Sequence, residues 1–258
     1  LLPVFLAGST ISRATLHNFD EIKRKDIREG DFVKIEKGGD VIPKVLEVIL
    51  NKRNKDSKPF KVPDRCPVCN TKLEKPEEEV YYYCPNYNCP AQVQGRIEHF
   101  VHRNAMEIEG LGESIIEIFL KNGFLKNYTD IYDLHLKKDE ILKLERFGEK
   151  SVDNLLAAIE ESKQKPFDKV LFALGIRHVG ERSAKILAKS FISIDNLMNA
   201  TEKEIQEVHE IGPKIAQSVS AFFKDKTNIS FIEKLKASGL KLESEKSLIK
   251  ENESFKNK

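Results

Sequence analysis

Short apolar runs alternate with turn residues at the start of the chain. Runs at residues 4–6 and 10–14 are joined by Gly8-Ser9, and this pattern predicts a first pair of short strands. Three apolar residues then recur at the spacing of one helical face: Leu16, Phe19 and Ile22. A short helix is therefore expected to follow the first strand pair.

Two longer runs, at residues 32–35 and 41–49, flank Gly38-Gly39-Asp40 and predict a hairpin. Pro43 lies inside the second run, and because it has no N–H to donate it must sit at a sheet edge or a bulge. Four strands and one short helix within residues 1–62 suggest a small β-barrel, of which the OB type is one candidate.

Residues 94–240 show helical periodicity and an internal repeat. Each repeat contains a tight turn that ends in an apolar residue and a glycine, and the final glycines are 36, 32 and 32 residues apart. The four turns are Gly110-Leu111-Gly112, Arg146-Phe147-Gly148, His178-Val179-Gly180 and Glu210-Ile211-Gly212. The segments behind them predict helices at residues 114–121, 150–161, 182–189 and 213–223. A near-constant period indicates one supersecondary unit used four times.

The last repeat carries two further helix signals. Thr201 and Glu204 form a capping-box pattern, and Pro213 suits the first turn of the following helix. Residues 241–258 carry mixed charge with few apolar anchors, which is typical of a linker or a frayed tail.

The chain has four cysteines, in the two pairs Cys66-Pro67-Val68-Cys69 and Cys84-Pro85-Asn86-Tyr87-Asn88-Cys89. Two close pairs separated by a short segment are typical of a tetrahedral zinc site, and four thiolates leave no open position for water. The sequence therefore predicts a structural zinc module over residues 63–93. A redox-active pair would leave the second pair unexplained. A disulfide framework is the other alternative, although no basic-then-apolar leader opens the sequence.

Tyr81, Tyr82 and Tyr83 lie between the two cysteine pairs and predict a strand that leads to the third ligand. A module this small needs aromatic cover for its metal, so packing is favoured over the stacking of nucleic-acid bases.

The repeated turns have the chemistry of anion binding. An apolar-Gly turn ahead of a helix leaves the first backbone N–H groups unpaired, with the positive end of the helix dipole behind them. Glycine removes the Cβ that would keep a phosphate oxygen away. Four such turns favour binding to the phosphates of duplex DNA, and contacts of this kind position a protein without reading bases. A purely helical scaffold is the alternative.

Charge limits how DNA could be bound. The formal net charge is only +2, so the molecule as a whole is not a polycation, and DNA binding has to come from local clusters and backbone donors. No apolar run approaches the roughly 18–20 residues of a membrane span. Leu1 begins inside a strand-like run, which suggests a piece of a longer chain.

Six segments together closely resemble NAD-dependent DNA ligases of bacteria, over Leu1 to about residue 240. They are Ser12-Arg13-Ala14-Thr15-Leu16-His17-Asn18, residues 39–45 (Gly-Asp-Val-Ile-Pro-Lys-Val), the two cysteine pairs with the Pro90-Ala91-Gln92 that follows, Phe147-Gly148-Glu149-Lys150-Ser151, and residues 173–181 (Ala-Leu-Gly-Ile-Arg-His-Val-Gly-Glu). The resemblance implies a multidomain α+β chain from the C-terminal part of the enzyme. Its domains would be an OB fold at 1–62 whose opening strand lies upstream of Leu1, a Cys₄ zinc finger at 63–93, and a helix-hairpin-helix domain with four hairpins at 94–240.

The resemblance also implies what the parent enzyme does. The family transfers AMP from NAD⁺ to a lysine and then to a 5′-phosphate, and it joins the nicked ends of duplex DNA with Mg²⁺ present, in replication and repair. That lysine lies in a Lys-x-Asp-Gly motif, which does not occur in this sequence. The segment is therefore expected to clamp DNA and to be inactive alone, in a monomeric, cytoplasmic, nucleoid-associated protein. The alternative is a stand-alone, non-catalytic DNA-binding accessory protein of repair.

By the same resemblance, nine residues are candidates for DNA contact. They are Arg13, Thr15, His17, Asn18, Gly110, Gly112, Gly148, Gly180 and Gly212. Arg146 departs from the family, which has glycine there, so it either adds a phosphate contact or marks a tolerant turn. His17 could equally cap or brace the short helix.

Other polar residues have plainer interpretations. His99, His102 and His209 have no ligand spacing with the cysteines, so surface or packing roles are expected. The run Lys23-Arg24-Lys25 could be a solvated face or could contact phosphate.

Overall fold

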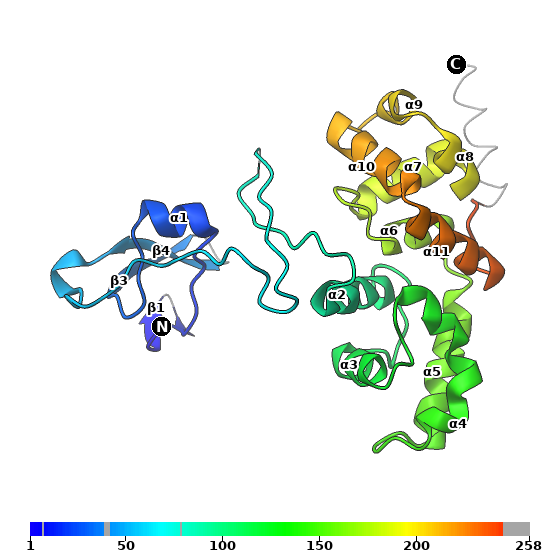
Figure 1. Cartoon of the computed structure of the whole chain (residues 1–258), viewed down its shortest axis with the longest axis horizontal. Coiled ribbons are helices and arrows are strands. Elements are labelled where there is room, and N and C mark those ends of the chain that lie inside the picture. The colour runs from blue at the N-terminus through cyan, green and yellow to red at the C-terminus, as the bar shows by residue number, and fades with distance from the viewer. Residues whose placement is uncertain (7, 39–41, 78, 245–258) are drawn as a thin grey trace. The chain divides into compact units, whose positions relative to one another are not determined.

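The computed structural model describes residues 1–6, 8–38, 42–77 and 79–244, and they form two compact units (Figure 1). The N-terminal unit is Leu1–Pro90 and the C-terminal unit is Ala91–Lys258. The prediction made for residues 39–41, the tip of the second hairpin, lies outside the described residues.

Strands and one short helix make up the first part of the N-terminal unit. Its elements are β1 (Val4–Leu6), β2 (Ser9–Ile11), α1 (Phe19–Arg24), β3 (Val33–Gly38), β4 (Ile42–Val48) and the 3₁₀ turn η1 (Leu50–Lys52). β1 pairs with β2 and β3 pairs with β4, both antiparallel, with an irregularity between Lys34 and Ile35. Pro43 lies in β4 of a two-stranded sheet, as its missing N–H required. Both predicted strand pairs are therefore present among the described residues, although they do not join into one sheet.

The helix α1 begins three residues later than the apolar spacing suggested. Asn18 is the cause, because its extended backbone (φ −151°, ψ 175°) and its side chain, which accepts a hydrogen bond from the N–H of Glu21 at 2.9 Å, form the N-cap. His17, just before it, has a φ of 61° and cannot belong to the helix. Leu16 therefore lies in the preceding turn.

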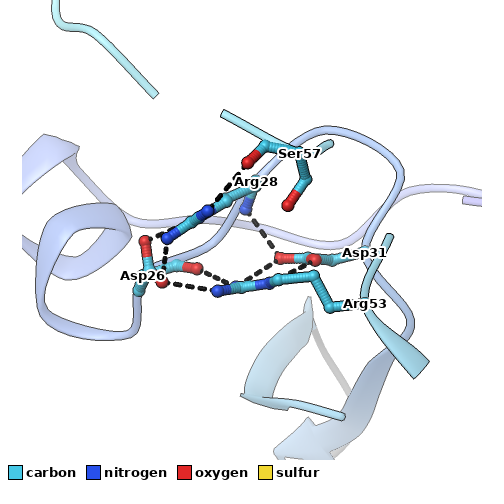
Figure 2. A network of polar contacts seen from close by, with 5 residues as sticks. All are labelled: Asp26, Arg28, Asp31, Arg53 and Ser57. Atoms are coloured by element: carbon cyan, nitrogen blue, oxygen red, sulfur yellow. Dashed lines mark hydrogen bonds and ion pairs between the residues drawn. The ribbon is translucent and has the colours of Figure 1, made fainter. Parts of the chain in front are cut away.

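Very little apolar surface is fully buried in the N-terminal unit. Among its described residues, the buried apolar side chains are Ile11, Val45, Cys66 and Cys89. A network of charged groups supplies long-range contacts instead (Figure 2).

The network joins the loop behind α1 to the chain that follows β4 (Figure 2). The Arg53 guanidinium donates to Asp31 Oδ1 and Oδ2, both at 2.8 Å, and to Asp26 Oδ2 at 2.5 Å. Arg28 donates to both carboxylate oxygens of Asp26 (3.0 and 2.8 Å) and to the Ser57 carbonyl (2.8 Å). The Asp31 side chain is only 1% exposed and that of Arg53 12%, so this pair is shielded from solvent. Two arginines and two aspartates thus fix the entry of β3.

This network is expected to make the N-terminal unit sensitive to acid. The hydrogen bond from Arg28 is the main cause that lowers the pKa of Asp26 to about 2, and the hydrogen bond from Arg53 lowers the pKa of Asp31. A carboxyl group whose pKa is lowered on folding stabilises the fold above its unfolded pKa, near 3.9, and loses that effect as the pH falls through its folded value. The network is therefore expected to stabilise the fold above about pH 4 and to fail toward pH 2.

The variant Arg53→Met tests this expectation. At pH 7 it should unfold at a clearly lower urea concentration than the wild type, because the buried Asp31 carboxylate would lose the guanidinium that pairs with it. Near pH 2 the two midpoints should converge. Arg24→Met is the matched control, since the Arg24 side chain is 65% exposed and pairs with Glu21, three residues before it. An unchanged midpoint for Arg53→Met at pH 7 would show that the network does not stabilise the unit.

Helices build the C-terminal unit, which begins just after the start of α2. The elements are α2 (Pro90–Val101), α3 (Glu113–Lys121), the 3₁₀ segment η2 (Tyr128–Lys137), α4 (Lys138–Ile141), α5 (Glu149–Ser162), α6 (Phe167–Ala173), α7 (Glu181–Phe191), α8 (Ile194–Asn199), α9 (Glu202–Gln206), α10 (Pro213–Lys224) and α11 (Lys226–Ala237). One apolar cluster runs through them from Ile97 to Leu242, and Phe100 stacks on Tyr128 within it at 4.9 Å. None of the helices in the described ranges combines the length and the apolar character that crossing a bilayer requires.

The predicted helix signals are confirmed in this unit. The four helices expected behind the repeated turns are α3, α5, α7 and α10, each within two residues of its predicted bounds. Thr201 and Glu204 form the predicted capping box of α9, and Pro213 occupies the first turn of α10.

Part of the predicted tail packs onto this unit. Leu242 is buried, its carbonyl accepts from the N–H of Ile194 at 2.9 Å, and the N–H of Ser244 donates to the carbonyl of Ile192 at 2.7 Å. Residues 241–244 therefore lie within the fold. The rest of the predicted tail, 245–258, lies outside the described residues.

Candidate metal centre and nucleic-acid interface

The four cysteine sulfurs converge on one point. All four Sγ atoms lie within 4.8 Å of one another, and the two sequence pairs meet at 3.4 Å between Cys69 and Cys84 and at 3.9 Å between Cys66 and Cys89. These distances are far longer than the roughly 2.05 Å of a disulfide bond, and all four cysteines are free. The predicted convergence of the two pairs is present, and neither a disulfide framework nor an isolated redox pair describes it.

A tight turn forms the first pair. The N–H of Asn70, whose φ is 59°, donates to the Cys66 carbonyl at 2.9 Å, and the Cys66 N–H donates to the Thr71 carbonyl at 2.8 Å. The Thr71 hydroxyl, 3.3 Å from Cys69 Sγ, is the main cause that lowers the pKa of this thiol to about 6. Burial raises the pKa of Cys84 to about 12. A metal that replaced these protons would bind more tightly as pH rises.

The three tyrosines before Cys84 do not form a strand. Only Tyr83 forms a bridge, in which it and Glu74 exchange both backbone hydrogen bonds at 2.7 and 2.9 Å. Tyr82 packs edge-on against Phe19 of α1 at 5.7 Å, whereas Tyr81 is 54% exposed. The packing role expected for the tyrosines therefore applies to Tyr82, and its partner is the helix α1.

All four repeated turns share one backbone design in the C-terminal unit. Their first residues adopt left-handed conformations: Gly110 (φ 83°), Arg146 (74°), His178 (64°) and Glu210 (70°). Their middle residues point inward, with Leu111, Val179 and Ile211 buried and Phe147 partly buried against the core. Their last residues are the glycines Gly112, Gly148, Gly180 and Gly212, which are the N-caps of α3, α5, α7 and α10.

Neither backbone strain nor packing explains the four final glycines. Their φ values lie between −78° and −94°, which any residue can adopt, so the left-handed strain lies two residues earlier, at the start of each turn. A Cβ built on any of them would meet no atom within 4 Å. Because glycine has no side chain, none of these N-cap residues can cap the first turn of its helix through a side-chain hydrogen bond. An open, uncapped helix N-terminus with no Cβ is the geometry that a phosphate oxygen requires.

The second turn differs from the others in one contact. The Gly148 N–H donates to Ser151 Oγ at 3.2 Å, and that hydroxyl donates to the Gly148 carbonyl at 2.8 Å. One of its backbone donors is therefore already used. Arg146, the first residue of this turn, adopts the left-handed conformation with a φ of 74°, so the turn accommodates a side chain there.

The third and fourth turns are joined by charge. Arg182, the second residue of α7, forms an ion pair with Glu210 of the fourth turn, and Glu181 pairs with Lys169.

Basic residues stand two positions after the last glycine in three of the four turns, at Lys150, Arg182 and Lys214. Their shared position is visible in the sequence when the four repeats are aligned at their final glycines.

The predicted contact residues of the N-terminal unit fall into two groups. Arg13 and His17 are exposed, and His17 lines a groove with Arg24, Lys25 and Lys44. Thr15 and Asn18 have structural contacts, because Thr15 Oγ1 accepts from the His17 N–H at 3.0 Å and Asn18 caps α1. The structure thus assigns the capping of α1, considered for His17, to Asn18.

The remaining polar candidates contact other groups of the protein. Lys25 of the basic run donates to the Val45 carbonyl at 2.6 Å and Arg24 pairs with Glu21. His99 lies 2.8 Å from the Phe172 carbonyl and packs on the Phe172 ring, while His102 Nδ1 accepts from the Asn104 N–H. These contacts agree with the packing and surface roles expected for these two histidines.

Comparison with known proteins places three of these regions in described families. Residues 1–57 match the family model for the NAD-dependent DNA ligase OB-fold domain, and residues 65–91 match that for the NAD-dependent DNA ligase C4 zinc finger domain. Residues 169–232, which contain the third and fourth turns, match the helix-hairpin-helix motif.

Curated relatives agree with these matches. The chain is 50% identical over 238 residues to a protein named DNA ligase from Acetivibrio thermocellus. The matched region covers 92% of this chain and 36% of the relative. The chain is 50% identical to a DNA ligase from Flavobacterium psychrophilum and 47% identical to one from Caldicellulosiruptor saccharolyticus, with 94% and 95% of this chain and 36% of each relative covered. The chain therefore spans about a third of the length of these relatives. It carries the OB-fold domain and the C4 zinc finger of NAD-dependent DNA ligases together with a helix-hairpin-helix region, which confirms the resemblance and the multidomain α+β fold class inferred from its motifs.

Proposed function

We propose that this chain is the DNA-clamping part of an NAD-dependent DNA ligase, which seals nicks between 3′-hydroxyl and 5′-phosphate ends of duplex DNA in replication and repair. The observation that carries the proposal is the set of four N-cap glycines, each with open space where a Cβ would point. In these positions the fold itself makes no demand for glycine, whereas an approaching phosphate does.

Each region has a role in this proposal. The final glycines of the turns, with Gly110 at the start of the first, bring backbone N–H groups to phosphates, and Arg13, Thr15, His17 and Asn18 form the contact segment of the OB fold. Such contacts hold a duplex without selecting its sequence. The domain bounds 1–62, 63–93 and 94–240 belong to the same proposal.

The cofactors divide between this chain and the rest of the enzyme. The residues Cys66, Cys69, Cys84 and Cys89 would hold one structural Zn²⁺, because four thiolates leave no position for water. NAD⁺ and Mg²⁺ would be bound mainly by other parts of the ligase, since this sequence has no Lys-x-Asp-Gly. We place the parent enzyme in the bacterial cytoplasm, associated with the nucleoid and monomeric.

The test is binding and adenylation by the purified 258-residue chain. Its affinity for duplex DNA should be insensitive to sequence and fall steeply with salt, because each neutralised phosphate adds about 0.9 to the log–log slope. Incubation with labelled NAD⁺ should leave no labelled protein, with a complete NAD-dependent ligase as the positive control. A covalent AMP adduct on this chain would contradict the assignment of the adenylated lysine to another part of the enzyme.

A stand-alone accessory protein of DNA repair is the rival function, and it predicts the same DNA binding. The reading frame that encodes the chain separates the two. A Lys-x-Asp-Gly motif some hundreds of codons upstream of Leu1 agrees with the ligase, whereas a start codon directly ahead of Leu1 agrees with the accessory protein.

A further inference from the structure

The helix α1 is too short to be stable without contacts to other parts of the N-terminal unit. It has six residues, and none of them is buried. Helices shorter than about 12–15 residues are marginal in water, so most of their stability has to come from packing. At its C-terminal end, Lys25 ties α1 to β4 through the Val45 carbonyl. The contacts of its N-terminal end come from elsewhere.

The N-terminal end of α1 packs on the zinc module and on the chain that leads to it. The Phe19 ring stacks on Phe60, with centroids 5.7 Å apart and planes 13° apart, and meets the Tyr82 ring edge-on, also at 5.7 Å. Lys75 Nζ donates to both carboxylate oxygens of Asp20 (3.0 and 2.8 Å) and lies 5.6 Å from the Tyr82 ring centre. Two aromatic contacts, an ion pair and a cation–π contact therefore converge on the first two residues of α1.

The cysteine cluster fixes the residues that make these contacts. Tyr82 and Lys75 flank the paired residues Glu74 and Tyr83, and Cys84 follows directly. A metal held by Cys84 would thus fix one end of this hairpin.

On its other side, α1 determines the conformation of a predicted contact segment. Asn18 caps the helix, and the His17 N–H donates to Thr15 Oγ1, while the Thr15 backbone bonds Pro43 and Val45 of β4 at 2.8 and 3.3 Å. The segment is therefore held between β4 and α1. His17 keeps its left-handed φ of 61° between these two attachments.

We infer that Tyr82, Phe60 and Lys75 are positioning residues for DNA binding: through Phe19 and Asp20 they hold α1, and through α1 they hold His17 and Asn18 in place. The zinc module then stabilises the contact segment of the OB fold as well as its own loop. The inference rests on the proposed function for the role of His17, and on the described contacts alone for the support of α1.

The first experiment measures amide hydrogen exchange in the full 258-residue chain. In Tyr82→Ala, the Ile22 and Lys25 amides of α1 should exchange about three- to tenfold faster than in the wild type, the range expected for the loss of one aromatic pair. Tyr81→Ala is the matched control, because Tyr81 is the neighbouring, exposed tyrosine. Zinc content should be one ion per chain in both variants. Equal exchange in Tyr82→Ala and the wild type would overturn the inference.

A second variant tests the inference in case Tyr82→Ala unfolds the zinc module. If Tyr82→Ala binds less zinc, Lys75→Gln removes the ion pair and the cation–π contact without removing a cysteine, and it leaves the charge of Asp20 in the first turn of α1. Its α1 amides should still exchange faster than those of the wild type, by a smaller factor than in Tyr82→Ala. Wild-type exchange in this variant would count against the inference.

The last experiment separates the inference from the proposed function. DNA affinity is compared for Tyr82→Ala, His17→Gly and the double variant, with glycine chosen because it accepts the positive φ. If Tyr82 acts through this segment, each single variant binds several-fold more weakly and the double variant is little weaker than His17→Gly alone. Fully additive losses would show that Tyr82 does not act through His17. Unchanged binding by His17→Gly would instead contradict the proposed DNA contact, and the exchange result would still decide the support of α1.

Discussion

Replacing Cys84 with serine is expected to abolish zinc binding and to unfold residues 63–93. The three remaining thiolates cannot complete the tetrahedral set, and the apparent binding free energy of a structural zinc site is on the order of 10–16 kcal/mol near neutral pH. Few other contacts can compensate, because Cys66 and Cys89 are themselves among the few buried apolar side chains of the N-terminal unit. Metal analysis of the purified chain and tyrosine fluorescence measure the two effects.

The control for this variant is Val68→Ser. Val68 lies between the first two cysteines and is 54% exposed, so this change places a serine in the same module without removing a ligand. Zinc content should stay at one per chain. Helical circular dichroism should persist in both variants, because the apolar cluster of the C-terminal unit does not include the cysteines. A folded wild-type chain that contains no zinc, or a Cys84→Ser variant with unchanged metal content and melting, would contradict the predicted site.

Placing aspartate at the last glycine of the third or fourth turn is expected to weaken DNA binding by about tenfold or more, because a charge-assisted hydrogen bond is worth roughly 1.5–3 kcal/mol. The new carboxylate would stand where a phosphate has to approach. Aspartate is a better N-cap than glycine, so the helix behind it should be at least as stable. DNA affinity and circular dichroism are measured on the same samples of Gly180→Asp and Gly212→Asp.

A change of charge alone has to be separated from a change at the turns. Ser193→Asp provides that control, because Ser193 is the N-cap of α8 in the same unit and the substitution adds the same charge at a helix start. It should reduce the affinity far less than either turn variant. The double variant Gly180→Asp/Gly212→Asp should compound the loss. Wild-type affinity in both single variants would favour the alternative that the turns are only a helical scaffold.

Local signals could be read from the sequence because each depends on a few neighbouring residues. The repeated turns, the capping box of Thr201 and Glu204 and the place of Pro213 all involve contacts within one turn. Each cysteine pair can be recognised by its own short spacing, although the two pairs meet across 15 and 23 positions. The helices behind the four turns were therefore predicted almost to the residue.

What the sequence did not reveal depends on contacts between distant residues. Arg53 meets Asp31 across 22 positions and Lys75 meets Asp20 across 55, and no pattern of spacing indicates such pairs. The start of α1 was placed too early because the apolar period outweighed the N-cap signal of Asn18. The strand expected at the three tyrosines is reduced to one bridge, because Tyr82 packs against α1. Residues 241–244 were predicted to belong to a tail because they contain two charged residues and a single apolar residue, Leu242, which is buried in the structure.

The scarcity of buried apolar groups in the N-terminal unit has a thermal consequence. The heat capacity change of unfolding follows the apolar surface that becomes exposed, and among the described residues of this unit only Ile11, Val45 and two of the cysteines are fully buried apolar side chains. Its free energy of unfolding should therefore curve only weakly with temperature, whereas the C-terminal unit, with its long apolar cluster, should show the usual dome. Cooling would then weaken the C-terminal unit more than the N-terminal unit, and the two units would be most stable at different temperatures.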